Sequence, residues 1–67
     1  MLKKQLGRRI AKLRQVAGLT QEKLAEKTGY SVAFVSLVER GINAPSIEGC
    51  EKIAKALCVS VKNLFDF

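Results

Sequence analysis

The stretch Thr20–Gly41, TQEKLAEKTGYSVAFVSLVERG, predicts two short helices joined by a tight turn. The remaining predicted helices are described relative to this pair. Thr20 suits the N-cap of the first helix, because its hydroxyl can accept a hydrogen bond from the first turn. Gly29 ends that helix, since glycine adopts a left-handed backbone freely. Ser31 caps the second helix, which we expect to end at about Arg40.

The same signals predict three further helices around this pair. The first runs from about Leu2 to Val16, and Gly18 suits its C-terminal end. Its apolar residues recur at helical spacing, as Leu2, Leu6, Ile10 and Leu13. After a loop over residues 41–45, in which Pro45 disfavours helix at the residue before it, Ser46 caps a fourth helix. The apolar stripe of that helix is Ile47, Cys50, Ile53, Ala54 and Leu57.

Ser60 caps a last short helix, and the chain ends in Leu64-Phe65-Asp66-Phe67. No stretch of convincing length alternates apolar and polar residues, so no sheet is expected. The sequence therefore predicts an all-α fold, a compact five-helix bundle that spans residues 1–67 as one domain. Because 67 residues bury only about 60% of the unfolded surface, we expect a marginal core that a dimer contact would supplement.

The net charge of +6 arises in the first helix and the segment that joins it to the second, residues 1–20. Residues 1–20 hold six of the twelve Lys and Arg and no acid, whereas residues 21–67 hold six bases and six acids. This asymmetry favours a polyanion as partner. A solvated basic helix face is the alternative, and charge alone leaves both open.

Several classes of function lack the residues that they need. No apolar run approaches the roughly 18 residues of a membrane span, and we expect no signal peptide, because Gln5, Arg8 and Arg9 interrupt the apolar residues near the N-terminus. Histidine is absent, and two cysteines cannot complete a four-ligand zinc site. We expect no enzyme, no cofactor, no metal, no small-molecule substrate and no membrane association, in a cytoplasmic setting. Cys50 and Cys58 are expected to be core thiols, with Cys58 mildly strained at a helix end where glycine is favoured.

The chain resembles the phage-repressor and Cro type of helix-turn-helix domain, the XRE family, over about residues 6–65. The matching segments are Ile10–Arg14, Leu19–Ala25, Thr28–Ser31, Val35–Gly41, Asn43–Ser46 and Ile53–Leu57. The resemblance implies a lambda-repressor-like bundle that places helix 31–40 in the major groove of duplex DNA. It implies a transcriptional regulator, of repressor or controller type, that binds a pseudo-palindromic operator as a homodimer.

The resemblance also implies roles for single residues. Phosphate contacts are implied for Thr20, Gln21, Arg40 and Asn43, although a plain N-cap and a helix C-terminal charge are alternative roles for Thr20 and Arg40. Base-edge contacts are implied for Ser31, Val32, Ala33, Ser36 and Leu37. A structural ion pair is implied for Arg14 and Glu39. A dimer contact is implied for Val61, Leu64, Phe65 and Phe67, with completion of the core as the alternative role of Leu64 and Phe65.

The reading face departs from the family pattern, which usually places long polar side chains there. Val32, Ala33 and Leu37 cannot make the bidentate hydrogen bonds that read guanine or adenine, but they can contact the thymine methyl group. We hypothesise weak or thymine-biased readout, with affinity mainly from phosphates. Alternatively, Val32, Phe34 and Leu37 form an exposed apolar patch that binds a protein, as in an antitoxin or assembly module.

Overall fold

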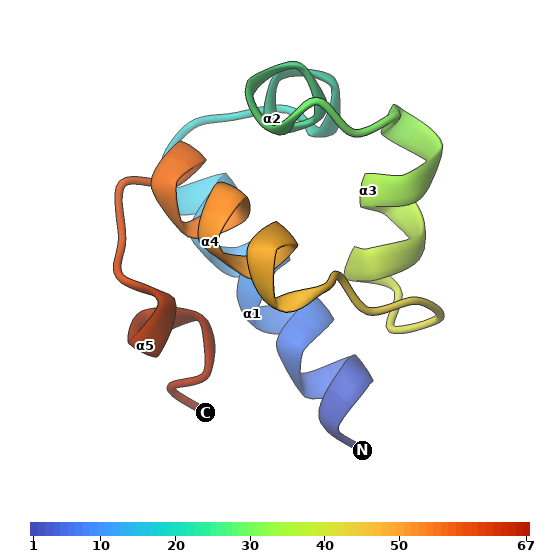
Figure 1. Ribbon diagram of the computed structural model, residues 1–67, viewed down its shortest axis with the longest axis vertical. Coiled ribbons are helices and arrows are strands. Elements are labelled where there is room, and N and C mark those ends of the chain that lie inside the picture. The colour runs from blue at the N-terminus through green and yellow to red at the C-terminus, as the bar shows by residue number, and fades with distance from the viewer.

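A computed structural model describes all residues, 1–67, and contains five helices and no strand (Figure 1). The predicted all-α class is therefore confirmed, and the expected bounds agree with those observed. The helices are α1 (Leu2–Val16), α2 (Gln21–Thr28), α3 (Val32–Glu39), α4 (Ile47–Ala56) and α5 (Val61–Leu64).

Four of the five helices begin at a hydroxyl cap, as predicted. In each, the cap oxygen accepts a hydrogen bond of 3.0–3.2 Å from the backbone N–H three residues later. The caps are Thr20, Ser31, Ser46 and Ser60. Each such bond stabilises its helix by about 1 kcal/mol, which matters because helices this short are marginal on their own.

All the helices, together with Leu57 just after α4, contribute to one hydrophobic core. In Figure 1, α4 crosses in front of α1, with α2 above them, α3 on the right and α5 at the lower left. The buried apolar residues are Leu6, Ile10, Leu24, Ala25, Val35, Val38, Cys50, Ile53, Ala54, Leu57 and Leu64. The buried position of Val35 and Val38 turns the opposite side of α3 toward solvent.

Two residues of the predicted apolar stripes lie outside this core. Leu2 is 61% exposed and Ile47 is 84% exposed, so the expectation that they pack inward is wrong. Both stand at the first position of their helices. Helical spacing identifies the face on which a side chain lies, but the neighbouring helices do not reach these ends.

Two glycines permit close approaches that their sequence context does not reveal. A Cβ atom on Gly7 would lie 2.8 Å from the carbonyl oxygen of Glu39 and still closer to that of Val38. Gly7 therefore lets α1 lie directly against the C-terminal end of α3. Gly49, which lowers the helix propensity of α4, is buried because the Tyr30 hydroxyl occupies the space that a Cβ would need.

The two cysteines differ in environment. Cys50 is buried, and burial raises the pKa of its thiol, as expected for a core residue. Cys58 is exposed, so the expectation of a core position is wrong for it. Cys58 follows α4 with a φ of 60° and donates its N–H to the Lys55 carbonyl at 3.1 Å. Because this left-handed conformation costs an L-residue energy, the predicted backbone strain is confirmed.

We expect Cys58→Gly to raise the free energy of unfolding by about 1 kcal/mol, since glycine adopts this backbone without the Cβ clash. Urea titration followed by circular dichroism measures the change. Cys58→Ala is the matched control, because it removes the thiol but keeps the clash. An equal gain from both variants would show that the thiol, and not the backbone, is the source of the effect.

Candidate nucleic-acid interface

A polar network at the C-terminal end of α3 holds the first three helices together. The Arg14 Nε atom donates to Glu39 Oε2 at 2.6 Å, and Arg14 Nη2 donates to Oε1 at 3.2 Å. The Gln21 amide donates to the same Oε1 at 3.0 Å, and Arg14 Nη1 donates to the Leu19 carbonyl at 2.7 Å. The side chains of Arg14 and Glu39 are only 14% and 6% exposed. The expected ion pair is therefore formed, and it includes a third partner that sequence reasoning missed.

The N-terminus of α2 lies beside this network. The Gln21 side chain, expected to bind phosphate, uses its amide nitrogen on Glu39, so the structure gives it a positioning role as well. The Thr20 hydroxyl accepts from Lys23 N–H. The backbone N–H groups of Gln21 and Glu22 lack an acceptor within the helix, as the first groups of any helix do. They can donate to an anion placed at this end of α2.

The exposed face of α3 offers methyl groups and hydroxyls. Ser31, Val32 and Ala33 are exposed, and Ser36 and Leu37 are half-buried. The structure thus brings the five expected base-edge residues onto one side of α3 and its N-cap. The charged residue of α3, Glu39, is turned away into the ion pair.

The apolar patch expected of Val32, Phe34 and Leu37 is smaller than the sequence suggests. Phe34 is half-buried and packs against Tyr30, with ring centroids 4.7 Å apart. Leu37 is half-buried as well. Of the three residues of the expected patch, only Val32 is exposed, at 41%.

The loop after α3 gathers basic and polar groups. Arg40 and Asn43 are both exposed there. A Cβ atom on Gly41 would lie 2.7 Å from the Lys4 Cα atom, so the first turn of α1 runs alongside this loop. The position of Lys4 was not foreseen, because the charge pattern does not say where α1 crosses α3. Neither Lys4 nor Arg40 takes part in a salt bridge.

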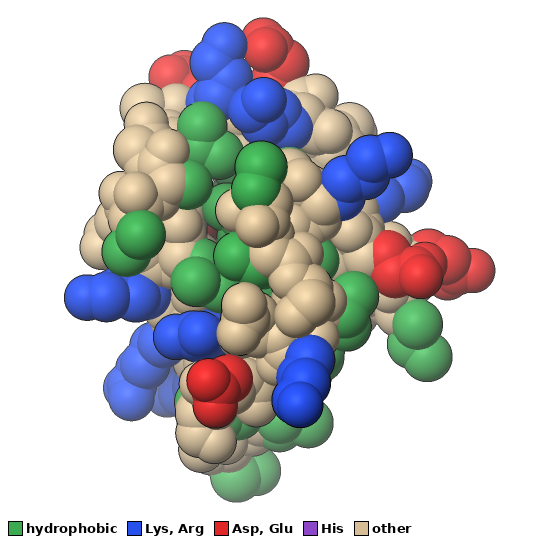
Figure 2. Space-filling model, turned by 90° about the vertical axis from the view of Figure 1, so that its left-hand side faces the viewer, with side chains coloured by type: hydrophobic (Ala, Val, Ile, Leu, Met, Phe, Trp, Pro, Cys, Tyr) green, Lys and Arg blue, Asp and Glu red, His purple; other side chains and the backbone are tan.

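The residues expected in a dimer contact divide into two groups. Val61, Phe65 and Phe67 are exposed, and the two phenylalanine rings lie 6.3 Å apart between centroids. Leu64 is 0% exposed within one chain, so its side chain belongs to the core, and the expectation that it contacts a second copy is corrected. Figure 2 shows the side of the molecule that carries α5, with hydrophobic side chains over its centre and at its lower end, among charged side chains.

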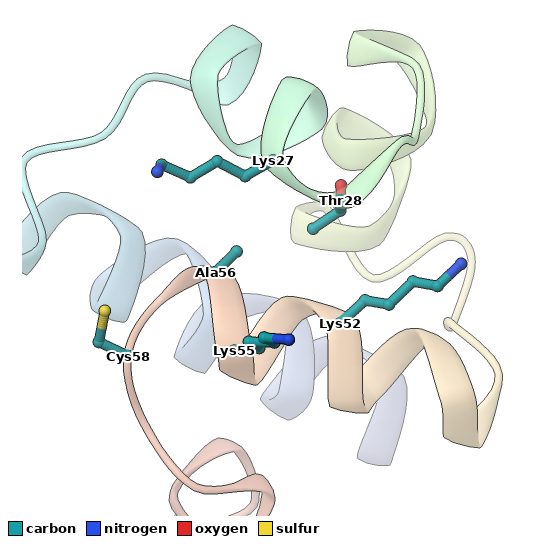
Figure 3. Close-up of a pocket in the computed structure, with 6 residues that line it drawn as sticks. All are labelled: Lys27, Thr28, Lys52, Lys55, Ala56 and Cys58. Atoms are coloured by element: carbon teal, nitrogen blue, oxygen red, sulfur yellow. The ribbon is translucent and has the colours of Figure 1, made fainter.

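A hollow on the surface lies between the C-terminal parts of α2 and α4, apart from the residues expected to contact DNA. It is open, with a volume of about 460 Å³. Figure 3 shows its lysine side chains pointing in different directions. The lining residues are Lys27, Thr28, Lys52, Lys55, Ala56 and Cys58. No three Cys, Asp or Glu side chains lie together in a way that could hold a metal ion, and no helix has the length and apolar character of a membrane span.

Comparison with known proteins relates this geometry to regulators. A family model described as helix-turn-helix matches residues 10–63. The transcriptional regulator SinR of Bacillus subtilis is 39% identical over 62 residues, which are 91% of this chain and 56% of that protein. The chain thus spans just over half the length of this relative.

Solved structures are similar over nearly the whole chain. The restriction-modification controller protein C.AhdI from Aeromonas hydrophila superposes with a TM-score of 0.90 at 37% identity, over 92% of this chain and 94% of that one. A structure of SinR in complex with DNA superposes with a TM-score of 0.85 at 39% identity, over 91% of this chain and 98% of that one.

We expect Glu39→Ala to lower the free energy of unfolding by about 3 kcal/mol, because it leaves the Arg14 guanidinium partly buried without its partner. It also removes the acceptor of the Gln21 amide. Chemical denaturation measures the loss. Glu26→Ala is the control, since it breaks only the exposed Lys23–Glu26 pair and should change stability by less than about 0.5 kcal/mol. Similar losses in both variants would contradict a central role for Glu39.

Proposed function

The chain belongs to the helix-turn-helix family of DNA-binding transcriptional regulators, and we propose that it binds a pseudo-palindromic operator as a homodimer, with α3 in the major groove. The observation that carries this proposal is the bonding of Glu39 to both Arg14 and Gln21. This bonding fixes the position of the N-terminus of α2 relative to the exposed face of α3. A fixed position is required if α2 is to contact a phosphate while α3 contacts the bases. The likeness to the DNA complex of SinR supports it.

Affinity in this proposal comes mainly from phosphate contacts on both sides of α3. On one side, Thr20 and Gln21 present the N-terminus of α2 to a phosphate. On the other side, Arg40 and Asn43 contact the DNA backbone, and Lys4 adds positive charge beside them. The lack of salt bridges at Lys4 and Arg40 leaves both charges available to DNA.

Base contacts in this proposal come from Ser31, Val32, Ala33, Ser36 and Leu37. The first three are exposed at the N-terminal end of α3, which is the part of a recognition helix that contacts base edges in this motif.

The dimensions of one chain constrain how two copies can meet. Recognition helices in successive major grooves lie about 34 Å apart, whereas one chain measures 26 × 22 × 21 Å. The α3 helices must therefore lie away from the dimer contact. A contact through Val61, Phe65 and Phe67 satisfies this, because α5 and α3 lie on opposite sides of the molecule (Figure 1).

Such a dimer would regulate transcription by occluding a promoter or by recruiting polymerase. Named relatives include a transcriptional regulator and a restriction-modification controller protein, and both roles fit the proposal. It requires the chain to share a compartment with duplex DNA, which keeps the cytoplasm as its expected location. The alternative, a protein-docking helix, is less supported because Phe34 is partly covered by Tyr30.

We expect Arg40→Gln to weaken DNA binding about equally for all sequences and to lower the slope of log K against log salt by about one for each phosphate that the variant no longer neutralises. Fluorescence anisotropy with labelled duplexes selected from a random pool measures both quantities. Lys52→Gln is the matched control, because it removes the same charge beside the hollow between α2 and α4. Equal effects of the two variants would remove Arg40 from the interface. Failure of the unaltered chain to bind any duplex at low salt would overturn the DNA proposal and favour the protein-docking alternative.

We expect Phe65→Asp to convert the protein to a monomer, because a buried carboxylate in an apolar contact is strongly unfavourable. Sedimentation at high micromolar concentration, with and without DNA, measures the state. Val16→Asp is the control, since Val16 is 73% exposed on α1 and takes no part in the proposed contact. An unaltered chain that stays monomeric under both conditions contradicts the dimer.

A further inference from the structure

We propose that α3 reads the C5-methyl group of pyrimidines in the major groove, on thymine or on 5-methylcytosine, rather than the hydrogen-bonding pattern of the bases. This inference rests on the proposed function, and it names the chemical group on the DNA that α3 selects. It makes cytosine methylation a signal to which binding responds.

The first argument is that α3 and its N-cap, residues 31–39, offer no free group able to make bidentate base contacts; Arg40, just after the helix, is assigned to phosphate in the proposed function. Residues 31–38 contain no charged and no amide side chain. Glu39 is held by Arg14, and the Gln21 amide donates to Glu39. The Ser31 hydroxyl oxygen accepts from Phe34 N–H, which limits its freedom to follow a base edge. The side chains of α3 therefore cannot recognise guanine or adenine through paired hydrogen bonds.

The second argument is that α3 presents methyl groups on the side that faces the major groove in the proposed function. Val32 and Ala33 are exposed in the first turn of α3, and Leu37, which is half-buried, lies one turn further on along the same side. Val35 and Val38 are buried on the other side, which fixes this face outward. Along the helix axis, Val32 and Leu37 are about 7.5 Å apart, at 1.5 Å per residue. That corresponds to about two steps of roughly 3.4 Å along a DNA strand.

The third argument concerns what an apolar face can distinguish. In the major groove, thymine presents an O4 acceptor and a C5-methyl group, whereas cytosine presents an N4 donor and no methyl. Cytosine methylated at C5 carries its methyl at the same ring position as thymine. A side chain that gains only from apolar contact therefore responds to the methyl, whichever pyrimidine carries it. Burial of one such methyl changes affinity by about fourfold.

The experiment begins with a duplex selected from a random pool by the unaltered chain. Each consensus thymine is then replaced in turn by uracil, which removes the methyl and leaves the base pairing unchanged. We expect about fourfold weaker binding at two thymines of each half-site, about two steps apart. At the same positions, 5-methylcytosine should bind more tightly than cytosine, by a similar factor.

Matched variants connect the effect to α3. Val32→Thr keeps the shape of the side chain but replaces one of its two methyl groups by a hydroxyl, and it should weaken the discrimination between thymine and uracil at one of the two positions. Val16→Thr makes the same change on the exposed face of α1 and should leave the discrimination intact. Any effect of uracil on the shape of free DNA is common to all three proteins and cancels in this comparison.

The outcomes separate this inference from the proposed function. A selected duplex that tolerates uracil at every thymine within about twofold, or that has guanine at the contacted positions, overturns methyl reading but leaves operator binding in place. Discrimination that persists unchanged in Val32→Thr and in Leu37→Ala also overturns it. Failure to bind any duplex overturns the proposed function itself, and the inference with it.

Discussion

The carboxylate of Glu39 is the group on which the arrangement of the first three helices depends. It ends α3, accepts two hydrogen bonds from Arg14 on α1, and accepts a third from Gln21 at the start of α2. The absence of a side chain at Gly7 lets the backbones of α1 and α3 approach at the same place. The contacts on the buried side of α3 thus fix the position and the direction of this helix. Its exposed side chains can change without altering the fold.

The fold was largely predictable because local signals determine it. The hydroxyl caps and Gly29 set the helix ends, and helical spacing identified most of the core. The exposed Leu2 and Ile47 were mispredicted, because spacing gives the face of a helix and not the extent of the neighbour that covers it. Leu64 is predicted in a dimer contact with completion of the core as the alternative, and its burial confirms the alternative; a terminal apolar cluster does not reveal which of its members faces inward.

The candidate site was less predictable for a related reason. The resemblance to a family supplied the pairing of Arg14 with Glu39, but the engagement of Gln21 by the same carboxylate depends on the orientation of two helices. The approach of Lys4 to Gly41 likewise depends on how α1 crosses α3. Such contacts join residues distant in sequence, and no periodic pattern records them. The assignment of single residues to phosphate, base and dimer contacts stays a prediction.

The contact between Tyr30 and Gly49 has a consequence for how this sequence can diverge. The tyrosine hydroxyl fills the space of a side chain at position 49, where alanine would otherwise favour the helix. Alanine at position 49 is therefore disfavoured while the hydroxyl is present. A residue without this hydroxyl at position 30 removes the closest contact and leaves the Pro45 Cβ atom 3.0 Å from the added Cβ. The order of the two substitutions matters, because a chain with tyrosine at position 30 and alanine at position 49 is the disfavoured intermediate. Selection on the turn before α3 is in this way coupled to selection on α4, although the two positions are distant in the sequence.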